Sequence, residues 1–269
     1  MFIESRTNTK IKNIVKLRNR AKRESSHLFF FEGAHLLEEY LRFGHMPYAI
    51  FISEKSERLY SDLINKIDKE TIYIVTENIF SKISTEKSPQ GILTVSKFID
   101  DRIILVDDNY EQLTKNQSYL FLESVRDNGN VGTIIRTAAA LGITCVLSKD
   151  CADIYSNKTI RASMGAIFSR KTYIANDFYT AVNTVKKSRR VFSTTLGESA
   201  LTLGKFEIKP KDSFVIGNEG RGISKETAAL CDLSVKIPMS DAAESLNASQ
   251  SAAILIWEMY KASKTDKPV

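Results

Sequence analysis

The first part of the 269-residue chain alternates short apolar runs with segments whose apolar positions recur every three or four residues. Apolar runs of this length predict strands, and the longer spacing predicts amphipathic helices. Strands are expected at 27–32, 48–53, 71–75 and 92–98, and helices at 33–44, 56–67 and 77–84. This pattern predicts a small α/β domain over residues 1–98, followed by an acidic, polar linker over 99–117.

A second alternation begins at residues 119–125, where bulky apolar residues occupy successive positions. Such a run is typical of a strand that is covered on both faces in a parallel sheet. Further strands are expected at 143–148, 171–175, 190–196, 212–219 and 233–239, and helices at 130–142, 157–168, 178–189, 224–231 and 245–263. We therefore expect a second α/β domain over 118–269, with a mostly parallel sheet and helices on both faces.

Positive charge is concentrated near the start of the chain. The net charge is +6, and eight bases without any acid lie between Arg6 and Arg23. Apolar residues in this run predict a single amphipathic helix, which is either a solvated helix or a face that contacts the phosphates of RNA or DNA. The run lacks the large apolar face of a membrane-surface helix, so we favour nucleic acid. The candidate RNA-binding residues are Lys10, Lys12, Lys16, Arg18, Arg20 and Arg23, together with Arg161.

Several classes of protein are disfavoured by composition. The longest strongly apolar run, residues 252–257, is much shorter than the roughly 20 residues that a membrane span needs. The N-terminus lacks the pattern of a secretory signal. Cys145, Cys151 and Cys231 are odd in number and show no CxxC spacing, which indicates reduced thiols in a cytoplasmic protein and no zinc site. We expect no membrane partner and no metal.

The sequence NVGTIIRTAAALG, residues 130–142, is an apolar helix with one charged residue. At about 100° per residue, one stripe of the helix faces the core. That stripe consists of Val131, Ile134, Ile135, Ala138 and Gly142. Arg136 lies off the stripe among small residues, where it either contacts a ligand or simply faces solvent.

Two further segments place polar residues at predicted strand ends. In FVIGNEGRGIS, residues 214–224, three glycines follow a strand, but the spacing matches neither a dinucleotide fingerprint nor a P-loop. In VKIPMSDAAESLNASQS, residues 235–251, we expect Ser245 to cap the last helix. Asn247 would then sit in the first turn, with its amide available to a ligand.

Taken in order, NVGTIIRTAAALG, VIGNEGRGIS and KIPM…ESLNAS resemble the three signature motifs of the SpoU-type (TrmH-like, SPOUT superfamily) RNA ribose 2′-O-methyltransferases. SRTNTKIKNIVKL, FFFEGAHLLEE and SPQGILTV are similar to the substrate-binding domain of members that act on ribosomal RNA. The resemblance implies an L30e-like RNA-binding fold for residues 1–98. It also implies that 118–269 form a deep C-terminal trefoil knot that binds S-adenosylmethionine. Family members are homodimers whose active sites draw on both subunits.

The resemblance also implies roles for individual residues. The cofactor contacts would be Thr195, Leu196, Gly217, Ile237, Met239 and Leu246, and the catalytic residues Arg136, Asn130, Glu219, Ser245 and Asn247. Arginine stays protonated in proteins, so we expect Arg136 to clamp an RNA phosphate and to stabilise the developing alkoxide. The proton of the ribose hydroxyl would pass to water, with Glu219 assisting, although the family has also been described with the arginine as the base.

The implied activity is methylation of a ribose 2′-hydroxyl, which we expect in 23S ribosomal RNA. A tRNA ribose methyltransferase is one alternative, and a non-catalytic RNA-binding or ribosome-assembly factor of the same fold is another. A dead site has no reason to keep all five catalytic positions, which argues against the second alternative. A nucleotide-binding enzyme for small molecules would leave the basic segment unexplained.

Overall fold

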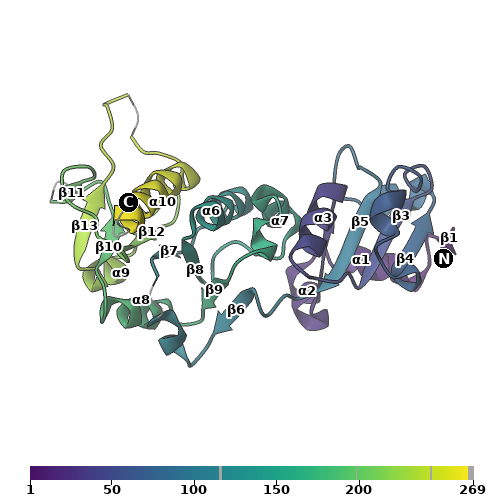
Figure 1. Ribbon diagram of the computed structural model, residues 1–269, viewed down its shortest axis with the longest axis horizontal. Helices are drawn as coiled ribbons and strands as arrows, with labels where there is room; N and C mark the ends of the chain where they lie inside the picture. The colour runs from purple at the N-terminus through teal and green to yellow at the C-terminus, as the bar shows by residue number, and fades with distance from the viewer. Residues whose placement is uncertain (115–116, 198, 243, 266–269) are drawn as a thin grey trace. The chain divides into compact units, whose positions relative to one another are not determined.

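The computed structural model describes residues 1–114, 117–197, 199–242 and 244–265, which form two compact units (Figure 1). Unit 1 consists of residues 1–99 together with 153–169. Unit 2 consists of residues 100–152 together with the described residues after 169. The chain therefore enters unit 2, returns to unit 1, and then completes unit 2.

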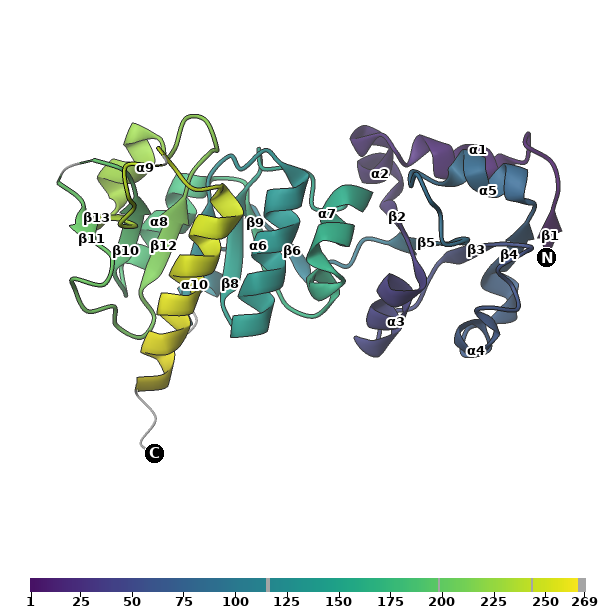
Figure 2. The ribbon, with the colours of Figure 1, turned by 90° about the horizontal axis from the view of Figure 1, so that it is seen from above.

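Unit 1 is built on a five-stranded mixed sheet in the order β1-β4-β3-β5-β2. Its strands are β1 (Phe2–Ile3), β2 (Leu28–Glu32), β3 (Ala49–Ser53), β4 (Ile72–Val75) and β5 (Ile92–Lys97). Its helices are α1 (Thr9–Lys16), α2 (Arg20–Ser26), α3 (Ala34–Arg42), α4 (Ser61–Ile64), α5 (Glu77–Ile83) and α7 (Asn157–Ser163), with the 3-10 turns η1 (Lys69–Thr71) and η3 (Ala166–Phe168). Strand β5 runs antiparallel to both β2 and β3. Helices α1 and α5 cover one face of the sheet, and α3 and α4 lie on the other (Figure 2).

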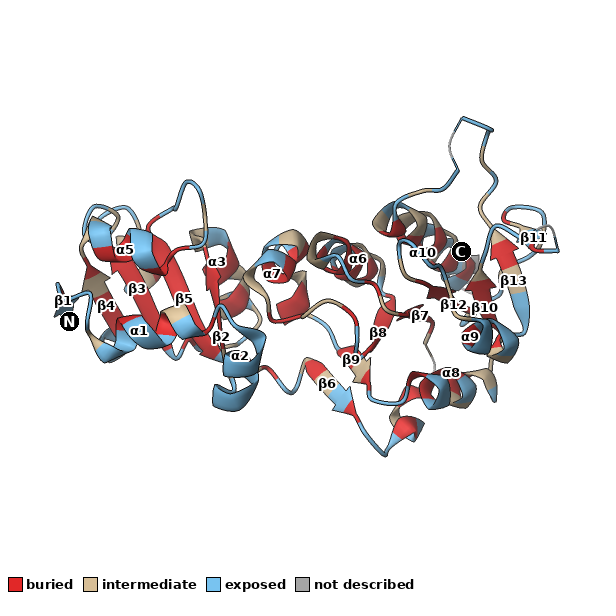
Figure 3. Cartoon of the chain, turned by 180° about the vertical axis from the view of Figure 1, so that it is seen from behind, coloured by how far each residue is buried: buried red, intermediate tan, exposed pale blue. Residues whose placement is uncertain are grey.

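The basic segment forms two helices rather than the single helix predicted. Ile11, Ile14 and Leu17 are buried against the sheet, as their spacing predicted. Asn8 caps α1 by accepting a hydrogen bond from the backbone N–H of Lys10. The helix ends at residue 16, α2 begins at residue 20, and both helices carry exposed residues (Figure 3).

Residues 153–169 belong to unit 1, which corrects the predicted domain boundary. The ring of Tyr155 stacks on Phe98 with 3.9 Å between centroids, and its hydroxyl accepts a hydrogen bond from the N–H of Ile99 at 2.9 Å. The side-chain amide of Asn157 donates to Oγ1 of Thr85 at 2.7 Å. Hydrophobic periodicity predicted a helix here, which the structure divides into α7 and η3, but periodicity cannot say which core a helix joins.

Unit 2 is built on an eight-stranded sheet in the order β11-β13-β10-β12-β7-β8-β9-β6. Its strands are β6 (Ile103–Val106), β7 (Tyr119–Leu122), β8 (Thr144–Ser148), β9 (Thr172–Ala175), β10 (Val191–Thr194), β11 (Leu201–Thr202), β12 (Ser213–Ile216) and β13 (Leu233–Lys236). Its helices are α6 (Asn128–Leu141), α8 (Phe178–Lys186), α9 (Lys225–Leu230) and α10 (Ala248–Thr265), with the 3-10 turn η2 (Tyr110–Thr114). All neighbouring strands pair in parallel, which confirms the predicted sheet. Helices α6 and α10 pack side by side on one face, and α8 and α9 pack on the other (Figure 1).

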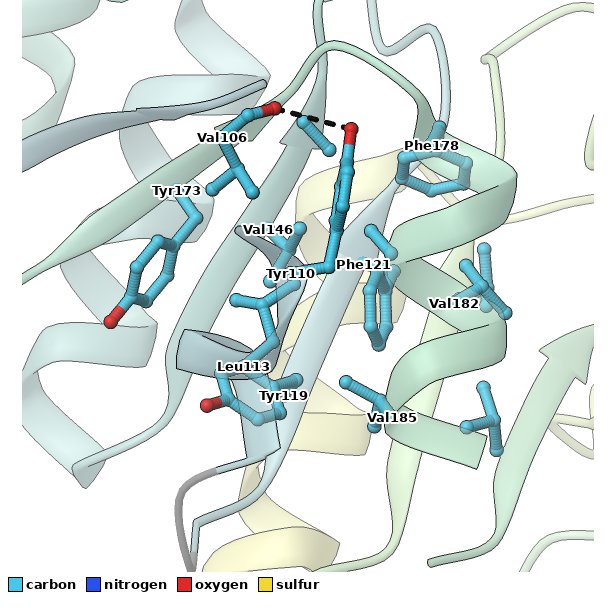
Figure 4. Close-up of a cluster of buried hydrophobic side chains, with 14 of the residues drawn as sticks. Val106, Tyr110, Leu113, Tyr119, Phe121, Val146, Tyr173, Phe178, Val182 and Val185 are labelled. Atoms are coloured by element: carbon cyan, nitrogen blue, oxygen red, sulfur yellow. Dashed lines mark hydrogen bonds between the residues drawn. The ribbon is translucent and has the colours of Figure 1, made fainter. Parts of the chain in front are cut away.

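Most of the predicted linker is part of unit 2. Strand β6 pairs with β9, and Val106, Tyr110 and Leu113 lie in the hydrophobic core beside Phe121 and Val146 (Figure 4). The Tyr110 hydroxyl donates to the carbonyl of Val106 at 3.2 Å. The linker prediction was wrong because the surrounding acidic and polar residues masked a short edge strand. Residues 115–116 lie outside the described part of the chain.

Helix α6 carries Arg136 and has clear start and stop signals. Asp127 caps it by accepting a hydrogen bond from the N–H of Asn130 at 2.9 Å. It ends at Gly142, whose φ of 78° requires the conformational freedom of glycine. Gly142 is therefore an exposed C-cap and not part of the core stripe, whereas the four other predicted stripe residues are buried.

Candidate active site

Unit 2 contains a cavity of about 530 Å³ at the carboxyl ends of three neighbouring strands, β13, β10 and β12. Because these strands are parallel, the loops that follow them emerge at the same edge of the sheet. The segment before α10 forms another wall. Open α/β sheets bind their ligands at this edge, and the volume lies within the usual range of ligand pockets, about 300–1,000 Å³.

The cavity brings together every residue that the resemblance assigned to the cofactor. These are Thr195, Leu196, Gly217, Ile237, Met239 and Leu246. Two predicted catalytic residues, Glu219 and Ser245, line the same cavity. Segments up to about 50 positions apart in the sequence thus meet in one place, and their roles there stay predictions.

Gly217 makes the tight wall of this cavity possible. A Cβ atom at this position would lie 2.2 Å from the carbonyl carbon of Gly222 and 2.3 Å from the nitrogen of Ile223. Asn218 and Gly222 exchange backbone hydrogen bonds of 3.0 and 2.9 Å, which fold the loop back on itself. Position 217 therefore requires a residue without a side chain, because the returning segment of the loop lies directly against it.

The carboxylate of Glu219 joins this loop to the start of α6. It accepts hydrogen bonds from Nδ2 of Asn130 at 3.0 Å and from the backbone N–H groups of Arg126 and Asp127 at 3.2 and 3.3 Å. Burial alone would raise the pKa of Glu219, but the hydrogen bond from Asn130 and those from backbone N–H groups outweigh it and lower the pKa. The carboxylate is therefore held ionised at a helix N-terminus, where negative charge is favoured.

Arg136 is exposed on α6 and does not line the cavity. Among the residues that the structure describes, it has no hydrogen-bond or ion-pair partner. Asn130, in contrast, is buried and reaches the cavity through its bond to Glu219. The fold therefore immobilises Asn130 and leaves the guanidinium of Arg136 available to a ligand.

The loop before α10 differs from its prediction. The helix begins at Ala248, so Ser245 does not cap it. Asn247 takes that role, because its Oδ1 accepts hydrogen bonds from the N–H of Ser249 at 2.8 Å and from the hydroxyl of Ser249 at 2.7 Å. Ser245 lies in the loop and faces the cavity, whereas Asn247 is not among the described residues that line it.

Two polar residues that hold the site together were missed in the sequence. The side chain of Asn218 donates to the carbonyl of Ser124 at 2.8 Å and accepts from the N–H groups of Gly220 and Arg221. An asparagine among glycines is a known signal for such a turn. Glu123 is buried at the end of β7, but in the sequence it appears only as one acid after an apolar run.

The role of Glu123 is to connect β7 to the start of α9. Its carboxylate accepts from the N–H of Ser224 at 3.0 Å, from the hydroxyl of Ser224 at 2.6 Å and from that of Thr227 at 2.7 Å. Ser224 in turn caps α9. The segment after β7 and the loop after β12 are thus joined by two carboxylates, one from each: Glu123 and Glu219.

In unit 1, two of the predicted RNA-binding arginines are engaged in the fold. Arg23 is 5% exposed, forms an ion pair with Asp153 and donates to the carbonyl of Leu17 at 2.5 Å. Its charge is neutralised inside the unit, so the prediction that it contacts RNA is wrong. Arg161 forms an ion pair with Glu86, although its side chain is half exposed.

The remaining basic residues of this set lie at the surface. Arg18 donates to the carbonyls of Lys82 and Ser84 at 2.8 Å each, and Arg20 forms an exposed ion pair with Glu24. The lysines are less constrained. Lys10, Lys12 and Lys16 are exposed, and within the described chain none of them forms an ion pair.

The cysteines are buried and offer no reactive group. Burial raises the pKa of Cys145 and of Cys231 to about 12 and that of Cys151 to about 11. Throughout the described residues, no group of three or more His, Cys, Asp or Glu side chains is placed to hold a metal ion. No helix in that part of the chain is long and apolar enough to cross a membrane.

A parallel α/β sheet with a cavity at its strand ends, two motifs that line this cavity and a third joined to it through Glu219 are the features expected of a SpoU-type RNA methyltransferase. Comparison with known families agrees: residues 117–257 match the SpoU rRNA Methylase family, and residues 8–94 match the MRM3-like substrate binding domain. The chain belongs to the SpoU rRNA methylase family.

Similar proteins span nearly the whole chain. The 23S rRNA (guanosine(2553)-2′-O)-methyltransferase RlmP of Bacillus subtilis is 31% identical over 261 residues, which cover 96% of this chain and 98% of that protein. The structure of an AdoMet-bound rRNA methyltransferase from Sinorhizobium meliloti is 24% identical and covers 97% of both chains, with a TM-score of 0.79. The SpoU methyltransferase AviRb of Streptomyces viridochromogenes, solved with AdoMet, is 21% identical over 97% of this chain and 100% of that one, with a TM-score of 0.81.

Proposed function

We propose that this protein transfers a methyl group from S-adenosylmethionine to a ribose 2′-hydroxyl of 23S ribosomal RNA. The observation that carries the proposal is that the second and third motif segments line one cavity in unit 2, while Glu219 of the second motif binds Asn130 of the first. The likeness to RlmP, which is named for this reaction on 23S rRNA, extends over both units and supports the choice of substrate.

The residues around the cavity suit this cofactor. Ile237, Met239 and Leu246 provide apolar contacts, and the backbone at Gly217 allows close approach. When bound, S-adenosylmethionine supplies an electrophilic methyl group. The ribose oxygen would accept this methyl group as the C–S bond breaks, the thioether would leave, and water would take the hydroxyl proton.

Arg136 and Glu219 have different roles in this scheme. The guanidinium of Arg136 holds an RNA phosphate and stabilises the developing alkoxide, since it remains charged and has no hydrogen-bond or ion-pair partner among the described residues. A carboxylate with a lowered pKa and three donors around it is a weak base, so Glu219 does not take the proton. Its role is to position the loop and α6. Ser245, which faces the cavity, is placed to contact the ribose, and Asn247 fixes the start of α10.

The enzyme acts as a homodimer in which Arg136 of one copy serves the cavity of the other. The exposure of Arg136 and its absence from the cavity wall of its own chain support this arrangement. Met239→Trp would place a bulkier side chain in the cavity and Arg136→Ala would remove the guanidinium. Mixing the two inactive variants should restore about a quarter of the wild-type activity if sites are shared, and none if each chain is self-sufficient.

Unit 1 binds the RNA substrate through its lysines, and the protein works in the cytoplasm, where ribosomal RNA is made. The trefoil knot belongs to the same proposal, and no metal takes part. Charge reversal at Lys10, Lys12 and Lys16 should weaken RNA binding and flatten its salt dependence.

Two measurements test the function. Calorimetric titration with S-adenosylmethionine should show binding that Met239→Trp abolishes, whereas a non-catalytic assembly factor would give no heat. Mapping of ribose methylation across total RNA from cells with and without the gene should then reveal one missing methyl group in 23S rRNA. A missing group in tRNA would identify the alternative substrate.

A further inference from the structure

Unit 1 contains a cavity of its own, of about 320 Å³, between helices α1 and α2 and the sheet. Its floor consists of apolar side chains from the strands, among them Leu28, Ala49, Phe51 and Val95. This volume is at the lower end of the range of small-ligand pockets, which suits one flat group better than a helical segment. The break between α1 and α2 leaves this part of the sheet open.

The rim of the cavity is basic. Lys10 and Lys16 come from α1 and Lys22 from α2, and the described residues around the cavity include no acid. The ammonium of Lys10 lies 4.8 Å from the centroid of the Tyr73 ring, which orients it without neutralising its charge. A concave surface with charge of one sign concentrates ligands of the opposite sign.

Tyr48 presents an aromatic ring at this rim. Its side chain lines the cavity while the residue remains 56% exposed. The position is fixed because its backbone N–H donates to the carbonyl of Val95 at 2.9 Å. Exposed rings on an ordered backbone are the usual platforms on which single-stranded nucleic acids stack their bases.

We propose that this cavity binds one unstacked nucleobase of single-stranded RNA, with Tyr48 against the base and the phosphates on either side held by Lys10, Lys16 and Lys22. Polar side chains at the rim, Asn13 and Ser25, can meet the edges of the base. The inference rests on the proposed function only in taking RNA as the ligand, and it assigns to unit 1 a contact with a base as well as with phosphates.

The test uses the full-length chain and two fluorescent probes in anisotropy titrations, a short oligouridylate and an abasic ribose-phosphate oligomer of equal length. Tyr48→Ala should weaken oligouridylate binding by between about fivefold and a hundredfold and leave abasic binding and the salt slope unchanged. Tyr48→Phe should bind as the wild type does. Lys16→Gln and Lys22→Gln should each weaken the binding of both probes and reduce the salt slope by about 0.7.

Lys66→Gln is the matched control, because Lys66 lies two residues after α4, a helix on the opposite face of the sheet (Figure 2). This variant should bind both probes with wild-type affinity and salt slope. Photocrosslinking of a thiouridine-containing oligomer gives a reading without any variant, and should label peptides around Tyr48 or α1.

Three results would overturn the proposal while leaving the methyltransferase intact. They are wild-type affinity of Tyr48→Ala for the oligouridylate, equal affinity of the wild type for both probes, and competition by polyglutamate as strong as by oligouridylate. The last would assign the cavity to an acidic peptide. Failure of the proposed function itself would look different, since the wild type would then show no heat with S-adenosylmethionine.

Discussion

The basic helices of unit 1 and helix α6 of unit 2 use arginine in opposite ways. Arg23 comes from a run of bases that suggests a binding surface, yet it is buried and paired with Asp153. Arg136 comes from an apolar helix in which a charge looks misplaced, yet it is exposed and forms no hydrogen bond or ion pair within the described chain.

The difference shows that local charge density does not identify the cations that bind a ligand. A buried pair costs desolvation energy that the fold recovers only when both partners and their hydrogen bonds are present. An exposed cation without a partner adds little to stability. The residues that the fold leaves unpaired are therefore the better candidates for function, and each variant below tests which group a residue belongs to.

The largest effect on stability is expected for Arg23→Leu. Removing the guanidinium takes away the charge that faces the partly buried Asp153 and the hydrogen bond to the carbonyl of Leu17, which should lower the free energy of unfolding by about 3 kcal/mol. Urea denaturation of the full-length protein, followed by far-UV circular dichroism, measures it. The double variant Arg23→Leu with Asp153→Leu should recover most of the loss, and Arg20→Leu should cost about 0.5 kcal/mol or less. A stable Arg23→Leu protein that binds RNA poorly would return Arg23 to the binding surface.

Arg136→Lys should have the opposite profile. We expect kcat for RNA methylation to fall by about 100- to 1,000-fold, because lysine cannot present a planar pair of donors to the phosphate and the alkoxide. The unfolding curve and the affinity for S-adenosylmethionine should stay unchanged, since Arg136 is exposed and does not line the cavity. Turnover close to wild type would show that a simple positive charge is enough at this position.

Asn130→Asp should disturb the link between α6 and the Gly217–Gly222 loop. It replaces the donor 3.0 Å from Glu219 with a second carboxylate, and should destabilise unit 2 by about 1–3 kcal/mol at pH 7. The double variant Asn130→Asp with Glu219→Gln restores a donor and an acceptor, and should recover much of the loss. A double variant no better than the single one would mean that the hydrogen bond is not what Asn130 contributes.

The stability of the wild type and that of Asn130→Asp should depend on pH in different ways. In the wild type, the folded pKa of Glu219 lies below its ordinary value of 4.5, so its contribution to stability is complete above that value and is lost as the pH falls through the folded pKa. In Asn130→Asp, two adjacent carboxylates raise the pKa of the pair. The stability gap between variant and wild type should therefore narrow as the pH falls from 7 to about 5. Urea titrations at several pH values would show it.

Much of the fold was predictable because apolar runs and helical spacing report burial directly. The strands of the parallel sheet and the buried stripe of α6 were found in this way. Strand β6 was missed because it is short, lies at the sheet edge and is surrounded by acids. The membership of residues 153–169 could not be predicted, because it depends on contacts with Phe98 and Thr85, which are distant in the sequence.

The site was predictable to the extent that its residues lie in motifs whose order is distinctive. Residues that act by contacts between loops, such as Glu123 and Asn218, have no periodic signal. Assigning the cap of α10 to Ser245 instead of Asn247 reflects the same limit, since both residue types are good caps and only the backbone geometry selects one. For Arg23, the partner that neutralises it lies 130 positions away.

The smallest effect is expected for Lys12→Gln, which removes one surface lysine near the paired arginines. Lys12 is exposed on α1 and does not line the cavity of unit 1. If it contacts one RNA phosphate, Lys12→Gln should weaken binding about fivefold near 0.1 M salt and reduce the salt slope by about 0.7 to 0.9, without a change in the unfolding curve. Lys66→Gln again serves as the control of equal charge.

Since one released counterion is the whole effect, the loss of affinity in Lys12→Gln should be the same for oligouridylate and for the abasic oligomer. A loss seen only with the base-bearing probe would place Lys12 at the nucleobase, and an unchanged slope would place the RNA on another face of unit 1.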